Sequence, residues 1–162
     1  MKAFLHVIQD IALLIARVAL GALMILHGWR RWQGEGIAAQ IEFLNQTNTP
    51  SPQVFAWGSV ILEMLGGLFL VFGLLTPLVA LAFVVQQILI IVYSKASKGV
   101  WVTDGGWEYN AVTACLALVL AAFGAGRAGL DGLFRRVRDS SDSDSGADDI
   151  GSGSYQAYDS TV

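Results

Sequence analysis

Four polar side chains stand inside long apolar stretches of this sequence. Arg17 and Glu63 carry opposite charges, and Gln86 and Gln87 are adjacent carboxamides in a stretch without any charged residue. An ionised side chain at the centre of a bilayer costs about 2.5–3.5 kcal/mol on insertion scales, so it is normally paired or functional. These residue types are suited to binding a substrate, to passing a proton, or to pairing with one another.

The spacing of the two charges predicts that they share one depth. Arg17 lies about nine residues into the first apolar stretch, and Glu63 about ten residues from the far end of the second. In antiparallel helices, at 1.5 Å per residue, both fall roughly 14–15 Å from the same membrane face. Gly21 and Gly67 lie one turn from these charges, and small residues let helices approach closely. We therefore expect Arg17 to contact Glu63, with the two glutamines completing the hydrogen bonds.

Two interpretations of this intramembrane polar layer remain open. In the first, Arg17 and Glu63 form a structural ion pair that fixes the register of the helices. In the second, the layer of Arg17, Glu63, Gln86 and Gln87 is a substrate, quinone or proton site.

A second group of polar and aromatic residues lies where apolar stretches end. His27 and Trp29 close the first stretch, while Glu108, Tyr109 and Asn110 open the last. A histidine beside a carboxylate can pass protons or bind a metal ion. This edge is a second candidate site, and the catalytic candidates are Arg17, Glu63, His27 and Glu108.

The sequence predicts no metal site and identifies no cofactor. His6 and His27 lie at opposite ends of the first apolar stretch, which argues against a multi-histidine site within one subunit. The sequence contains no haem, flavin or nucleotide motif, and nothing in it resembles a nucleic-acid-binding patch. A quinone remains as one cofactor candidate.

The composition indicates a membrane protein. Hydrophobic residues make up 54% of the chain and charged residues 14%, with a mean hydropathy of +0.56. Soluble domains average about 25% charged residues. A membrane-spanning helix needs about 20 mostly apolar residues, and four stretches approach this length. The predicted fold is an all-α integral membrane four-helix bundle with spans at about 8–28, 54–73, 77–94 and 109–125.

The remaining segments suggest what lies outside the bilayer. Residues 34–46 fit a short amphipathic helix at the membrane interface, and residues 127–138 a basic interfacial stub. Residues 139–162 hold six acidic side chains and no Lys or Arg, in a Ser-, Asp- and Gly-rich context typical of disorder. We therefore expect a membrane domain at 1–138 and a disordered acidic tail at 139–162.

Four spans place both termini on one side of the membrane. A slight excess of Lys and Arg on that side predicts cytoplasmic termini. The aromatic residues gather at the opposite surface, as an interfacial belt or part of a site: Trp29, Trp32, Trp57, Tyr93, Trp101, Trp107 and Tyr109.

Short motifs along the chain, taken in order and spacing, resemble the DoxX family of bacterial four-helix membrane proteins. They cover about residues 15–131 and read Arg17-Val18-Ala19-Leu20-Gly21, His27-Gly28-Trp29, Glu63-Met64-Leu65-Gly66-Gly67, Gly73-Leu74-Leu75-Thr76-Pro77, Gly106-Trp107-Glu108-Tyr109 and Phe123-Gly124-Ala125-Gly126. The resemblance implies a multi-pass protein of the bacterial inner membrane. It also implies a link to redox or sulfur metabolism, because related proteins include subunits described as quinone-linked thiosulfate oxidoreductases.

Three functions compete at this stage. The first is a membrane subunit of a quinone- or thiol-linked oxidoreductase complex, working with soluble redox or sulfur-handling proteins. The second is a non-catalytic membrane anchor that recruits soluble partners, and the third is a small transporter subunit. The sequence does not decide whether the chain is an enzyme on its own, nor its substrate or oligomeric state.

Overall fold

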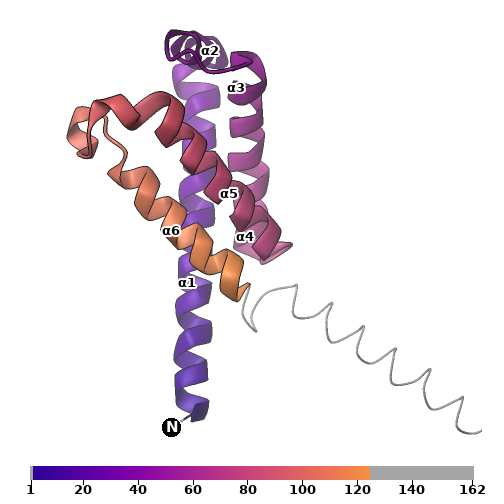
Figure 1. Cartoon of the computed structure of the whole chain (residues 1–162). Helices are drawn as coiled ribbons and strands as arrows, with labels where there is room; N and C mark the ends of the chain where they lie inside the picture. The colour runs from indigo at the N-terminus through magenta and orange to yellow at the C-terminus, as the bar shows by residue number, and fades with distance from the viewer. Residues whose placement is uncertain (1, 125–162) are drawn as a thin grey trace, which may run out of the picture.

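The computed structural model describes residues 2–124, and every regular element within them is a helix (Figure 1). Helix α1 (Lys2–Trp29) continues as the π-helical segment η1 (Arg30–Glu35) and is followed by α2 (Ile37–Gln46). The later elements are α3 (Pro52–Ile61), η2 (Leu62–Gly66), α4 (Gly67–Phe72), α5 (Thr76–Ile90), η3 (Ile91–Lys95), η4 (Ala96–Lys98), η5 (Val102–Asp104) and α6 (Glu108–Phe123). The predicted all-α fold class is confirmed.

Within residues 2–124, three continuous helices are long and apolar enough to cross a membrane. They run over Phe4–Glu35, Pro52–Phe72 and Thr76–Lys98. The fourth apolar helix, α6, has 16 residues. At 1.5 Å per residue it spans about 24 Å, which is less than the roughly 30 Å of a bilayer's hydrocarbon core. The chain is therefore a membrane helical bundle in contact with lipid, with three long helices and one short one.

The turn between α4 and α5 follows directly from its sequence. Gly73 ends α4 at φ 71°, a left-handed conformation that glycine adopts without steric cost. Leu75 also has a positive φ of 49°, and Pro77 follows in the first turn of α5. Proline is favoured there because its φ is already helical and its missing N–H would have no partner. The second and third spans are consequently joined as a tight antiparallel hairpin.

Helix α1 approaches α4 through two glycines that face each other. A Cβ placed on Gly21 would lie 2.6 Å from the carbonyl oxygen of Gly67. A Cβ on Gly67 would lie 2.7 Å from the carbonyl oxygen of Gly21. Both distances are far below van der Waals contact, so only glycine permits this crossing. The backbones therefore touch here, and this contact fixes the relative height of the two helices.

The core is a small apolar cluster shared by α1, α4, α5 and α6. Its fully buried members are Leu20, Met24, Leu70, Val79, Ala80, Phe83, Ala117 and Leu120. Large apolar side chains also cover the outer faces, as Leu26, Leu78 and Val112 illustrate with 64%, 64% and 69% exposure. A soluble protein would not expose so many, whereas lipid covers them without cost.

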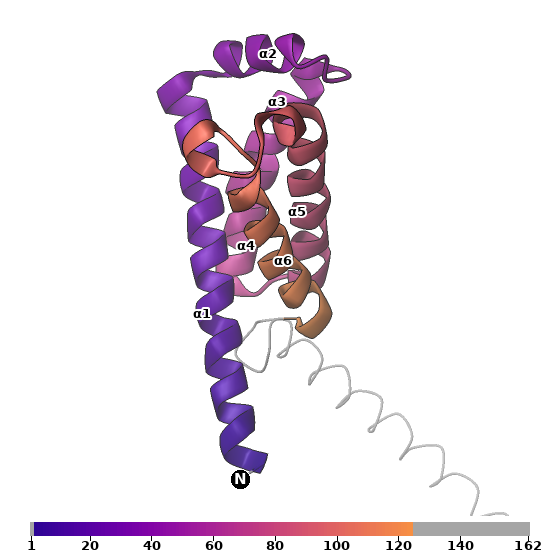
Figure 2. The same ribbon diagram turned by 60° about the vertical axis from the view of Figure 1, so that its left-hand side comes forward.

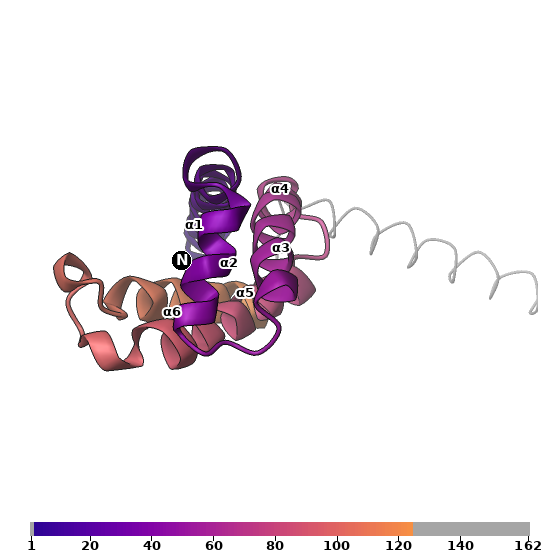
Figure 3. The ribbon, with the colours of Figure 1, turned by 90° about the horizontal axis from the view of Figure 1, so that it is seen from above.

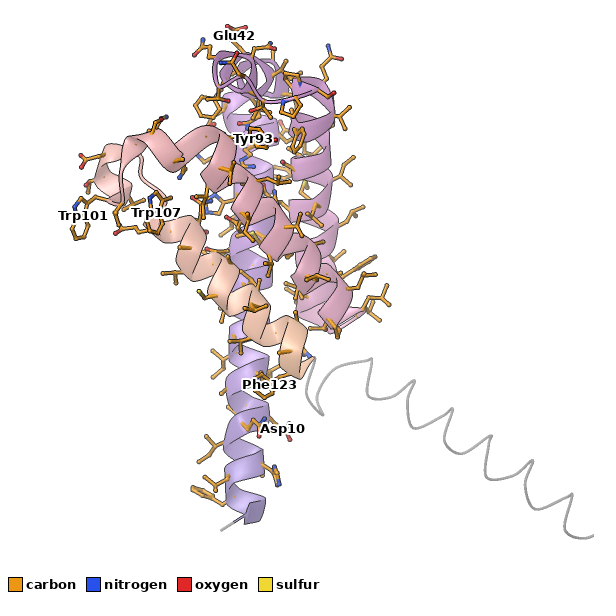
Figure 4. The ribbon with its side chains drawn as sticks, in the orientation of Figure 1. Asp10, Glu42, Tyr93, Trp101, Trp107 and Phe123 are labelled. Carbon is orange, nitrogen blue, oxygen red and sulfur yellow. The ribbon has the colours of Figure 1, made fainter. Side chains whose placement is uncertain are left out.

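The three long helices and α6 do not form a closed, parallel cylinder. Helices α5 and α6 run obliquely to α1 in Figure 1, while α1 extends beyond the other helices at its N-terminal end. At the other end α2 lies across the bundle, above α1 and α3 (Figures 2 and 3). Tyr93 lies just below α2, and Phe123 and Asp10 lie toward the opposite end (Figure 4).

The structure describes only one of the three segments that were predicted to lie outside the bilayer. Helix α2 falls within the predicted segment 34–46, and its interfacial location stays a prediction. The predicted basic stub at 127–138 and the acidic tail at 139–162 lie outside the described residues.

The glycine contact gives a stability prediction. Gly21→Ala or Gly67→Ala should lower the free energy of unfolding in detergent by about 1–3 kcal/mol, because the added methyl group has no space. Gly58→Ala is the matched control, since nothing lies within 4 Å of a Cβ at that helical position. The control should be neutral or slightly stabilising, because alanine favours helix. Equal losses in all three variants would contradict this packing.

Candidate functional site

A cavity of about 400 Å³ lies beneath α2, inside the end of the bundle that carries the α5–α6 loop. Its wall receives side chains from every long helix, including Met24, Glu63, Gln87 and Asn110. Ala39, Gln40, Phe43 and Leu44 of α2 also line it, so this helix forms one of its walls. The volume falls within the range of small-molecule sites.

Each π-helical segment of residues 2–124 contributes to this cavity. Arg30, Arg31 and Glu35 come from η1, and Glu63 comes from η2. Tyr93, Ser94 and Lys95 come from η3. A π turn inserts an extra residue into a helix and rotates the side chains that follow, and such turns occur frequently at functional sites. The departures from regular α-helix in all three spans thus coincide with one location.

Glu63 is the centre of the polar wall. Its side chain is 1% exposed, and its Oε1 accepts hydrogen bonds from Arg31 Nη1 at 2.9 Å and from Gln86 Nε2 at 2.8 Å. Two donors on one oxygen compensate for part of the cost of removing a carboxylate from water. The second oxygen, Oε2, has no hydrogen-bond partner and is fully enclosed.

A second chain of contacts runs beside this cluster. Asn110 Nδ2 donates to Gln87 Oε1 at 2.6 Å, and Gln87 Nε2 lies 4.0 Å from the sulfur of Met24. The Tyr109 hydroxyl lies 2.9 Å from His27 Nε2, with ring centroids 5.3 Å apart. These contacts tie α6 to α1 and α5 and hold the carboxamides in place.

The predicted contact between Arg17 and Glu63 is wrong. At the level of Glu63 the residue on α1 is Gly28, whose added Cβ would lie 3.0 Å from the Cβ of Glu63. Arg17 stands eleven residues earlier on α1, which is about 16 Å along the axis. Arg17 is buried, at 2% exposure, and makes a polar interaction of its own. The polar layer therefore keeps Glu63, Gln86 and Gln87 and loses Arg17.

The error has a simple geometric origin. Gly21 and Gly67 were expected to let the helices approach closely, but Arg17 and Glu63 each precede their glycine by one turn. In antiparallel helices those two directions are opposite, so the charges lie on either side of the contact.

Only some residues of the predicted edge of the bundle line the cavity. His27, Tyr109 and Asn110 line the cavity. Glu108 instead accepts a hydrogen bond from the backbone N–H of Val102 at 2.9 Å and closes the loop before α6. Trp29 is 53% exposed and packs edge-on against Trp32, outside the cavity wall. The expected pairing of His27 with Glu108 is thus replaced by His27 with Tyr109.

Sequence reasoning missed the cations of the site. Arg31 and Lys95 were assigned to connecting segments, yet both line the cavity because η1 and η3 extend their helices. The signal available in the sequence was the charge of Arg31, which is opposite to that of Glu63. Among residues 2–124 no three His, Cys, Asp or Glu side chains come together as a potential metal site.

These features are those of a polytopic membrane helical bundle with a cavity of mixed polar and apolar lining between its spans. A family model assigns the chain more narrowly, since the DoxX model matches residues 12–96. The chain belongs to the DoxX family, and the suspected resemblance is confirmed. Searches of curated proteins and of solved structures found no match.

The ion pair at the cavity gives the second prediction. Arg31→Met and Glu63→Gln should each lower the free energy of unfolding by about 3–5 kcal/mol, because each change removes one partner of a buried pair. The double variant should lose less than the sum of the two, which measures their coupling.

A second ion pair in the same segment serves as the control. Arg30 and Glu35 are also 3.0 Å apart, but their side chains are 75% and 49% exposed. The same cycle on this pair should give a coupling of about 0–1 kcal/mol. Similar coupling for both pairs would contradict the enclosed position of Glu63.

Proposed function

We propose that this DoxX protein is the membrane subunit of a redox-linked system and that its cavity binds a quinone or a sulfur compound. The observation that carries the proposal is the cavity of about 400 Å³, with the buried carboxylate of Glu63 and the carboxamides of Gln86, Gln87 and Asn110 in its wall. Family membership is consistent with this role, and the function itself is our inference.

The mixed lining favours a ring-sized ligand over a small oxyanion. Phe43, Phe55 and Tyr93 offer aromatic surface, and Leu89 and Ile90 add aliphatic surface. Apolar walls with a few placed polar groups are typical of small-molecule sites. A quinone has an apolar ring and tail with polar groups at the ring, which matches this distribution better than thiosulfate does.

A proton route would be part of such chemistry, because reduction of a quinone consumes two protons and two electrons. His27 and Tyr109 are in hydrogen-bond contact within the cavity wall, and both are proton-transfer groups. The electrons would be exchanged with a cofactor of a partner protein.

The third prediction tests occupancy. The full chain, purified in mild detergent, should retain quinone on organic extraction and should bind added decylubiquinone. Ala39→Trp should reduce this binding about tenfold or more, because Ala39 lines the cavity and an indole would fill it. Ala38→Trp is the matched control, since Ala38 is the exposed neighbour outside the cavity wall. A quinone-free protein that binds none and carries an attached soluble enzyme would support the anchor hypothesis instead.

The fourth prediction concerns orientation. We propose a bacterial inner-membrane location with cytoplasmic termini, on the Lys and Arg bias of the sequence. The α2 end of the bundle, whose residues line the cavity, would then lie toward the outer surface, opposite the N-terminus (Figure 2). A reporter active only in the cytoplasm should be active when fused after Val162. Activity of a periplasmic reporter at the same position, with an inactive cytoplasmic one, would reverse the assignment.

A further inference from the structure

The cations that line the cavity outnumber its carboxylates. Arg30, Arg31 and Lys95 belong to the wall, and the carboxylates of the wall are Glu35 and Glu63. Each carboxylate already has an arginine as its partner, at 3.0 Å in Arg30–Glu35 and at 2.9 Å in Arg31–Glu63. Within residues 2–124, no carboxylate lies within ion-pair distance of Lys95. Lys95 is therefore the cation of the wall whose charge is not neutralised.

The ammonium of Lys95 is on the cavity side of η3. Lys95 comes from η3 and His27 from α1, and the charge of Lys95 acts on the His27 ring. Both side chains line the cavity, so this interaction runs between two of its walls. Lys95 is partly exposed, and its ammonium is consequently open to a ligand in the cavity.

The charges around Lys95 are also positive. Those that act on it belong to Arg31 and Lys98. Neighbouring cations repel one another, and an anion beside them relieves the repulsion. Water screens a lysine at an open surface, but screening is weaker in a cavity with apolar walls. A negatively charged group on the ligand would therefore be stabilised at this position.

Aromatic side chains line the same cavity. The ring of Tyr93, two residues before Lys95, has its centroid 6.4 Å from that of Phe55. His27 and Tyr109 form a second pair, with centroids 5.3 Å apart. All four rings belong to the wall, and flat ligands stack favourably against such rings. The wall thus combines surface for an aromatic ring with a cation that lacks a partner.

We propose that the cavity binds an aromatic anion, with its ring against the aromatic side chains and its acidic group beside Lys95. This inference rests on the proposed function, because it specifies the charge of the ligand that the same cavity takes. A quinone ring that carries an ionised hydroxyl or carboxyl group is one member of this class.

The anion should bind about tenfold more tightly than a neutral ligand of the same shape. A hydrogen bond from an ammonium to a charged oxygen is stronger than one to a neutral oxygen. The preference should fall as the salt concentration rises, because ions screen a charge that is only partly enclosed.

The experiment compares 2-naphthoate with 2-naphthamide. The two have the same ring and nearly the same shape, but only 2-naphthoate is charged at neutral pH. Their dissociation constants and that of decylubiquinone are measured by isothermal titration calorimetry, with the full chain in mild detergent. Ala39→Trp gives the background, because an indole that fills the cavity leaves only uptake by the detergent.

Lys95→Met should remove most of the preference, because it keeps an apolar stem of similar length and deletes the charge. Binding of 2-naphthamide should be unchanged in this variant, which shows that the cavity is intact. Lys95→Arg is the matched control at the same position, and it should retain the preference. Lys98→Met removes the same charge three residues later, outside the cavity wall, and should leave most of the preference.

A fatty acid is another source of a carboxylate on an apolar body. Decanoate carries the same charged group on a flexible chain and has no ring to stack. It should bind more weakly than 2-naphthoate. Tighter binding of decanoate would assign the cavity to a lipid and overturn the proposal of an aromatic ligand.

The outcomes separate this inference from the proposed function. Tighter binding of 2-naphthoate that Lys95→Met removes and Lys95→Arg preserves supports the inference. Equal binding of the two naphthyl ligands, binding of neither, or a preference that survives Lys95→Met overturns it, and saturable binding of decylubiquinone then leaves the proposed function standing. Failure of decylubiquinone alone to bind overturns the quinone role and leaves a site for an aromatic anion.

Discussion

The carboxylate of Glu63 is the constraint on which the rest of this bundle depends. It is enclosed in an apolar membrane domain, where an uncompensated charge is too costly to keep. Compensation requires Arg31 from η1 and Gln86 from α5 to meet at one oxygen. Three separate helical segments must therefore hold a fixed relative height and rotation. The π turns at Arg30–Glu35 and Leu62–Gly66 contain Arg31 and Glu63 themselves. A π turn changes the rotation of the side chains on a helix, so these turns help to bring the two charges together.

Close packing below the cavity makes that precision attainable. Gly21 and Gly67 bring two backbones into contact, and a contact between backbones allows less sliding than one between flexible side chains. The wall formed by α2 is held differently, by the buried Leu44 and by Lys98, whose ammonium lies 5.1 Å from the ring of Phe43. The site thus combines a rigid inner wall with an outer wall that is attached at fewer points.

The fold class could be predicted from the sequence because long apolar stretches must form helices in a bilayer, where the backbone has no water to bind. The family could be predicted from the order of the short motifs. The sequence also allowed prediction of the Gly21–Gly67 approach and of Glu63, Gln86, His27 and Asn110 as notable residues. The partner of Glu63 could not be derived by counting residues from helix ends. Depth depends on where the backbones touch, and the side-chain direction of Arg31 depends on a π turn that leaves no signature in composition. Glu108 was misread because a carboxylate at a helix start serves a loop N–H as readily as a ligand.

Stability alone does not explain the polar wall. An apolar cluster of similar volume in place of Glu63, Gln86 and Asn110 would avoid burying a charge and three unsatisfied acceptors, and such replacements are often stabilising. An ion pair kept only for helix register would not need the additional carboxamides of Gln86 and Asn110 in the wall of a cavity. Places where a sequence gives up local stability are expected to be functional. The polar wall of the cavity is therefore consistent with the binding role that we propose for it.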